Sequence, residues 1–130
     1  MTPHITGLYA IPLTLFMVAL SAHVSMLRAT TNISIGDGGN SSLALRIRRH
    51  GNFIENVPMA LLLMALAELL GTGSLWLHAA GLLLLVGRLF HALGLNVTQP
   101  ASPLRIAGGS MTTLATLIAA GNILAHLIAT

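Results

Sequence analysis

The chain has 130 residues, of which 55% are hydrophobic and only 7% are charged, and its mean hydropathy is +0.85. Because soluble domains carry about 25% charged residues, this composition excludes an ordinary soluble domain and indicates a protein embedded in lipid. The net charge of +3 comes from arginines set against three acids, and no nucleic-acid-binding motif accompanies it. The absence of cysteine excludes a disulfide, a thiolate metal site and a cysteine nucleophile, and we expect no metal site.

The first apolar stretch covers residues 5–28 and is followed by a Gly-rich polar loop over residues 29–42. At about 1.5 Å per residue, the stretch is long enough to cross a hydrocarbon core of about 30 Å. No lysine or arginine precedes it, and it is longer than the apolar region of a signal peptide. We therefore predict a first membrane span rather than a cleaved leader.

The second apolar stretch, residues 43–70, begins with the most polar segment of the chain, RIRRHGNFIENVP. Arg48, Asn52 and Glu55 follow i, i+4, i+7 spacing, so a helix places them within roughly 60° of one another. Ionisable groups carried into a span usually mark a site. For Arg46 and Arg49 a purely topological role remains an alternative. Glu68, near the far end, is expected at the membrane rim within reach of water.

The third and fourth stretches cover residues 75–96 and 103–129. Arg88 lies about 12 Å inside the third span and shares one helix face with His91. A buried arginine needs a carboxylate, and we predict that Glu55 supplies it. Ser102 and Pro103 fit the N-cap and first position of the fourth helix, which places Arg105 in its first turn.

The sequence therefore predicts an all-α membrane protein, with a single domain over residues 1–130 that forms a four-helix bundle. Five arginines flank the first and third connections, and the other side of the bundle has neither arginine nor lysine. This asymmetry predicts that both connections are cytoplasmic and that both termini lie on the non-cytoplasmic side. The five residues are Arg28, Arg46, Arg48, Arg49 and Arg105.

The cytoplasmic mouth gathers more guanidinium groups than Glu55 alone can satisfy. Free guanidinium groups favour an anionic ligand whose carboxylates they bind in a bidentate manner. The mouth also opens towards the bilayer, so a second, lipophilic reactant or a lipid could enter from there. The charges and the spans together indicate an anionic, water-soluble cofactor that meets a lipophilic substrate.

Three motifs resemble those of the MAPEG family, the membrane-associated proteins in eicosanoid and glutathione metabolism. They are Arg48-x-x-x-Asn52-x-x-Glu55-x-x-Pro58 in the second span, Gly87-Arg88-x-x-His91 in the third and Pro103-Leu104-Arg105 in the fourth. The resemblance covers essentially the whole chain in the number, order and spacing of the spans. The absence of lysine and the short connections look like a bacterial member, in the inner membrane.

The resemblance implies a homotrimer that binds glutathione on the cytoplasmic side, between neighbouring subunits. It implies a glutathione-dependent transferase or peroxidase that acts on lipophilic electrophiles or lipid hydroperoxides. Arg105 matches the arginine that stabilises the thiolate, which is the catalytic role. The residues that match glutathione contacts are Arg28, Arg48, Asn52, Glu55, Arg88 and His91.

The chain departs from the family pattern at two positions. Leu95 stands where family enzymes often carry a tyrosine, one turn after His91, and Asn56 stands where some members have another. The only tyrosine, Tyr9, is expected at the opposite side of the membrane. A non-catalytic member that binds a lipid or a partner protein is therefore the alternative function.

A second alternative is a haem-binding bundle with two histidine ligands. Four histidines fall into two pairs of similar depth, which makes ligation by two histidines conceivable. The pairs are His78 with His126, and His23 with His91.

Overall fold

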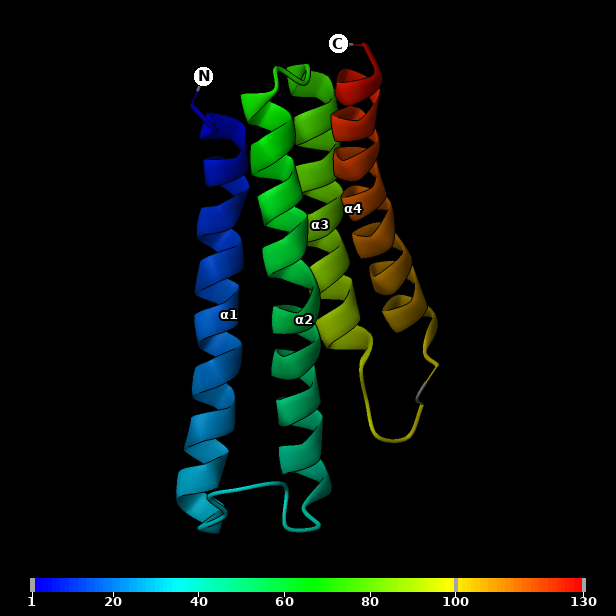
Figure 1. Cartoon of the computed structure of the whole chain (residues 1–130). Helices are drawn as coiled ribbons and strands as arrows, with labels where there is room; N and C mark the ends of the chain where they lie inside the picture. Colours follow the sequence, from blue (N-terminus) through cyan, green and yellow to red (C-terminus); the bar gives the residue numbers. More distant parts are fainter. Residues whose placement is uncertain (1, 100, 130) are drawn as a thin grey trace.

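The computed structural model describes residues 2–99 and 101–129, and over this range the chain forms four α-helices (Figure 1). Met1, Pro100 and Thr130 of the predicted domain lie outside the described residues. The helices are α1 (His4–Thr31), α2 (Ser41–Leu69), α3 (Ser74–Gly94) and α4 (Pro103–Ala129). All four are long and apolar enough to cross a membrane, which confirms the predicted all-α, four-helix membrane protein. Their bounds differ from the predicted spans by at most three residues.

The helices run alternately up and down, so both chain termini lie at one end of the bundle (Figure 1). The connections after α1 and after α3 lie at the other end, which we call the loop end. Because α1 and α2 have 28 and 29 residues and α3 has 21, the α1–α2 hairpin extends further at the loop end than α3 and α4 do. The first two turns of α2 therefore project beyond the last turn of α3.

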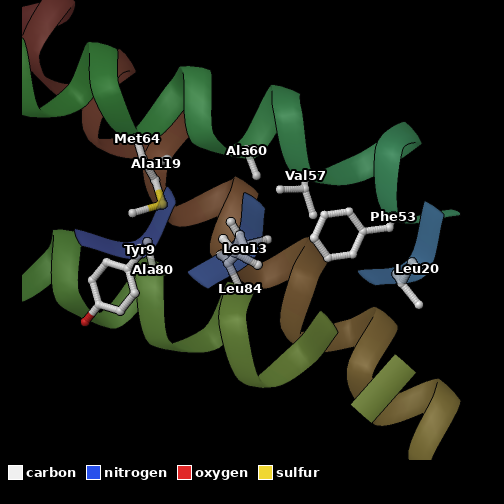
Figure 2. Close-up of a cluster of buried hydrophobic side chains, with 11 residues drawn as sticks. Tyr9, Leu13, Leu20, Phe53, Val57, Ala60, Met64, Ala80, Leu84 and Ala119 are labelled. Atoms are coloured by element: carbon white, nitrogen blue, oxygen red, sulfur yellow. The ribbon is translucent and has the colours of Figure 1, made fainter. Parts of the chain in front are cut away.

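The core lies where the four helices meet, and α2 contributes the largest share of its buried side chains (Figure 2). Its buried residues recur at intervals of three or four, as expected for one apolar helix face. Large side chains come mainly from α1, α2 and α3, whereas α4 contributes alanines. The best buried core residues are Leu13, Phe53, Val57, Ala60, Met64, Ala80, Leu84, Ala115 and Ala119.

Glycines allow α3 and α4 to approach closely near the loop end. A Cβ atom on Gly94 would collide with the backbone nitrogen of Arg105, and one on Gly108 would collide with the backbone nitrogen of His91. A Cβ atom on Gly87 would lie 2.9 Å from the carbonyl oxygen of Gly108. Small residues of this kind are typical of helix contacts in membranes. They place His91 directly beside the first turns of α4.

The predicted start of the fourth helix is confirmed by its capping contacts. The Ser102 hydroxyl accepts a hydrogen bond from the backbone N–H of Arg105 at 3.3 Å and donates one to the carbonyl of Gly94. One side chain therefore caps α4 and also joins it to the last residue of α3. The orientation of the first turn of α4, which carries Arg105, is fixed by this contact.

Glu68 lies in the last turn of α2, as predicted for a rim residue, and lines a cavity of about 350 Å³ there, but it has partners that the sequence did not reveal. Its side chain is buried and accepts three hydrogen bonds of 2.8 Å, from the backbone N–H groups of Ile5 and Thr6 and from the Thr6 hydroxyl. The first N–H groups of a helix have no partner within the helix, and its N-terminus attracts negative charge. Glu68 of α2 therefore caps α1.

Candidate functional site

Arg88 lies at the centre of the polar cluster near the loop end. Its side chain is only 1% exposed, and its guanidinium carbon lies 5.6 Å from the centre of the Phe53 ring. One terminal nitrogen donates a hydrogen bond to Oδ1 of Asn52 at 2.8 Å and lies 3.4 Å from Nδ1 of His91. The Nε–H group is buried and has no hydrogen-bond partner among the described residues.

The predicted ion pair between Glu55 and Arg88 was wrong. Glu55 is 56% exposed at its side chain and lies 3.4 Å from Arg48, while Arg88 is held by the amide of Asn52. The buried face of α2 is centred on Phe53 and Met64. At about 100° per residue, Asn52 stands about 100° from that face and Glu55 about 160°. Asn52 therefore reaches α3, whereas the carboxylate of Glu55 points outward.

His91 and Arg105 are brought together by the contact between α3 and α4. His91 is buried, and its ring lies 4.0 Å from where a Cβ atom of Gly109 would stand. The Arg88 guanidinium group lies 3.4 Å from Nδ1 of His91, and the Gly94 contact brings the backbone of Arg105 against the last turn of α3. The structure thus groups the candidate residues of α2, α3 and α4 at one end of the bundle: Arg48, Asn52, Arg88, His91 and Arg105.

Arg28 lies further out, and its recorded contacts are with the loop that follows α1. Its guanidinium group donates hydrogen bonds to the carbonyls of Ile33 and Gly36, at 3.0 and 2.9 Å. These bonds hold the loop in shape. Of the candidate glutathione contacts, Arg28 is therefore bonded to the loop after α1 and not to the cluster around Arg88.

Arg46 and Arg49, for which a purely topological role was an alternative, connect helices. Arg46 donates a hydrogen bond to the carbonyl of His23 in α1, and Arg49 donates one to the carbonyl of Leu95 after α3, both at 2.8 Å. Sequence reasoning missed both contacts, and it also missed Phe53, which packs against Arg88. The spacing of Phe53, Val57, Ala60 and Met64 on one helix face could have identified that aromatic residue.

Of the histidines considered as haem ligands, His78 and His91 contact other side chains, Tyr9 and Arg88 respectively. Nδ1 of His78 lies 3.0 Å from the Tyr9 hydroxyl, and the two rings meet edge to face. Among the described residues, no group of three or more His, Cys, Asp or Glu side chains could hold a metal ion. Tyr9 lies in the second turn of α1, at the end of the bundle opposite the arginine cluster.

The chain has relatives among known membrane proteins. The chain matches the model of the MAPEG family over residues 6–125. It is 38% identical over 92 residues to inner membrane protein YecN of Escherichia coli strain K12, an alignment that covers 71% of this chain and 70% of the relative. The protein of the same name from Escherichia coli O6:H1 strain CFT073 matches with the same identity and coverage. Because the family match spans all four helices and the polar cluster that they form, the chain belongs to the MAPEG family.

Proposed function

We propose that the chain is a glutathione-dependent transferase or peroxidase that acts on lipophilic electrophiles or lipid hydroperoxides. The observation that carries this proposal is the buried guanidinium group of Arg88, which has no carboxylate partner among the described residues. An uncompensated charge in a low-dielectric interior is costly. An anionic ligand with carboxylates would supply the missing negative charge, and glutathione carries two of them.

The chemistry of the side chains fits glutathione. Arginines bind carboxylates with charge-assisted hydrogen bonds, and the carboxylate of Glu55, which pairs with Arg48 but is more than half exposed, is accessible to an ammonium group. The amide of Asn52 and the ring of His91 offer hydrogen bonds to the peptide groups of the ligand. We assign binding to Arg28, Arg48, Asn52, Glu55, Arg88 and His91.

Arg105 is the residue that we assign to activation of the thiol. Glutathione supplies a thiol nucleophile, and a nearby guanidinium group lowers the pKa of a thiol from about 8.5. A larger fraction is then ionised at neutral pH, which is the reactive form. The position of Arg105 in the first turn of α4, beside His91, supports this role.

The assembly and orientation complete the proposal. The chain is a multi-pass inner membrane protein, in keeping with its Escherichia coli relative. We propose a homotrimer in which glutathione lies between neighbouring subunits, with both termini on the non-cytoplasmic side. The side chains of Arg48 and Glu55 pair with each other but are more than half exposed, which leaves them open to contact with a second subunit.

The test is the ultraviolet absorbance of the thiolate when glutathione is added to the purified protein. We expect a band that saturates at millimolar glutathione and is lost in Arg105→Ala. Arg46→Ala removes the same charge at the same end, where its guanidinium group bonds to the His23 carbonyl, and should leave the band intact. A protein that shows no band, or an equal loss in both variants, would contradict the proposal.

A non-catalytic, lipid- or partner-binding protein is the second candidate function. The observation that favours it is Leu95, which lacks the hydroxyl of the tyrosine common at this position in the family. Under this function, phospholipid or protein would copurify with the chain, and added glutathione would give no thiolate band. Native mass spectrometry of the purified protein distinguishes this result from the first.

A further inference from the structure

An apolar groove lies at the loop end, between the first two turns of α2 and the residues that follow α3. Its volume is about 220 Å³. In Figure 1 the connection after α3 descends beside the lower half of α2, and these two segments form the walls of the groove. The groove is lined by Ser41, Ala44, Leu45, Arg48, Leu95, Asn96 and Val97.

The groove is continuous with the candidate glutathione site. Ser41, Leu45 and Arg48 follow i, i+4, i+7 spacing, and Asn52 continues the same face of α2 by one further turn. Arg48 therefore belongs both to the groove and to the polar cluster. A ligand held by Arg48 and Asn52 would have the apolar groove as its immediate neighbour.

The far wall of the groove is held in place by another arginine. Arg49 donates a hydrogen bond of 2.8 Å to the carbonyl of Leu95, and Leu95 is itself buried. Because this bond joins α2 to the end of α3, it fixes the separation of the two walls. The groove is thus a built feature of the fold.

The lining is mainly apolar, and its polar residues are Ser41, Arg48 and Asn96. Leucine, valine and alanine side chains surround the space, and Leu95 contributes an apolar group where a tyrosine would bring a hydroxyl. Pockets for drug-sized ligands have volumes of roughly 300–1,000 Å³. The groove is smaller, so it suits one compact apolar group rather than a whole lipid.

We infer that this groove receives the apolar group of the second substrate, and that the substrate is a compact hydrophobic electrophile rather than a long-chain lipid. The inference rests on the proposed glutathione-dependent function and narrows its substrate class. The groove lies beyond the last turn of α3, so the substrate enters from the headgroup region at the loop end. Leu95 and Val97 are the residues that determine this specificity.

The test uses S-alkyl glutathiones of increasing chain length as probes, with the full chain in phospholipid nanodiscs and calorimetry as the measurement. Each buried methylene is worth about 0.8 kcal/mol, or about fourfold in affinity. We expect this gain from S-methyl to S-hexyl glutathione and a plateau at S-decyl glutathione, once the groove is full.

Val97→Asn is the test variant and Ile35→Asn is its control. Both side chains are exposed and aliphatic, and both lie in connections at the loop end, but only Val97 lines the groove. Val97→Asn should reduce the gain per methylene at least twofold and leave the affinity for S-methyl glutathione unchanged. Ile35→Asn should change neither quantity.

Three outcomes overturn the inference, and they separate it from the proposed function. Equal gains per methylene in the two variants, or a gain that continues to S-decyl glutathione, would place the alkyl chain in the bilayer while the glutathione site stands. Failure of the unaltered chain to bind any probe, glutathione included, would overturn the proposed function and the inference with it.

Discussion

At the scale of single residues, two side chains differ most from their predicted roles. Glu55 was expected to neutralise Arg88 but is half exposed, and Glu68 lies at the rim as expected but is buried against the start of α1. For Glu55 the predicted partner was wrong, and for Glu68 no partner was predicted. Arg88 donates a hydrogen bond to the amide of Asn52, and Glu68 accepts hydrogen bonds from the backbone of α1. Neither partner can be recognised from helix spacing, because each lies on another helix.

The contact between Asn52 and Arg88 can be measured with a double-mutant cycle. Asn52→Ala and Arg88→Leu should be coupled by about 1 kcal/mol or more, since hydrogen bonds to charged groups are worth about 1.5–3 kcal/mol in proteins and neutral ones between membrane helices about 0.6. The free energy of unfolding in mixed micelles is the quantity to measure. Glu55→Gln with Arg88→Leu should be additive within about 0.5 kcal/mol. Coupling in the second cycle and none in the first would restore the pair that we reject.

At the scale of helices, α3 and α4 pack against each other through glycines, whereas α1 and α2 pack through large side chains. Gly94 and Gly108 bring the backbones of α3 and α4 into contact, which places His91 beside Arg105. Across the other contact, Phe16 and Phe53 pack edge to face with their centres 5.4 Å apart. The candidate site lies where both kinds of packing meet, so its geometry depends on the glycine contact.

Two glycines of α4 provide a matched test of this dependence. A Cβ atom on Gly108 would collide with the backbone of α3, whereas one on Gly121 would meet nothing within 4 Å. Gly108→Ala should therefore destabilise the protein by roughly 1–3 kcal/mol. Gly121→Ala should be neutral or stabilising by up to about 1 kcal/mol, because alanine is the better helix former.

Thermal unfolding of the two variants in the same detergent is the measurement. Similar midpoints for Gly108→Ala and Gly121→Ala would show that the close approach of α3 and α4 is not required. A loss confined to Gly108→Ala should be accompanied by a weaker thiolate signal, because His91 and Arg105 would separate.

At the scale of the whole molecule, the arginines are concentrated at one end. Five of them flank the connections after α1 and α3, and the two termini lie at the opposite end (Figure 1). Positively charged residues are retained on the cytoplasmic side of a membrane. The α1–α2 hairpin and the groove beside it should therefore face the cytoplasm, where glutathione would reach the site.

The orientation can be tested by cysteine labelling without background, because the chain has no cysteine of its own. We expect a membrane-impermeant thiol reagent applied to intact spheroplasts to label Leu75→Cys, at the start of α3. It should label Ile35→Cys only after the membrane is opened. Both positions are highly exposed, at 76% and 91%, so accessibility within the protein is comparable. The reverse pattern would place the arginines outside and contradict the proposed orientation.

The sequence by itself determined the number of helices, their bounds to within three residues and the end of the bundle at which the polar residues gather. These properties follow from hydropathy, capping residues and spacing along one helix, all of which are local. The cap at Ser102 was predictable for the same reason. The family motifs added the identities of the candidate residues.

Only the tertiary structure decided which side chains meet. The Asn52–Arg88 contact, the cap that Glu68 provides for α1 and the groove between α2 and Leu95 each join residues at least 36 positions apart. Such contacts depend on how each helix is rotated about its axis, and side-chain packing across the core sets that rotation. Phe53 turns one face of α2 inward, and the direction of Glu55 follows from it.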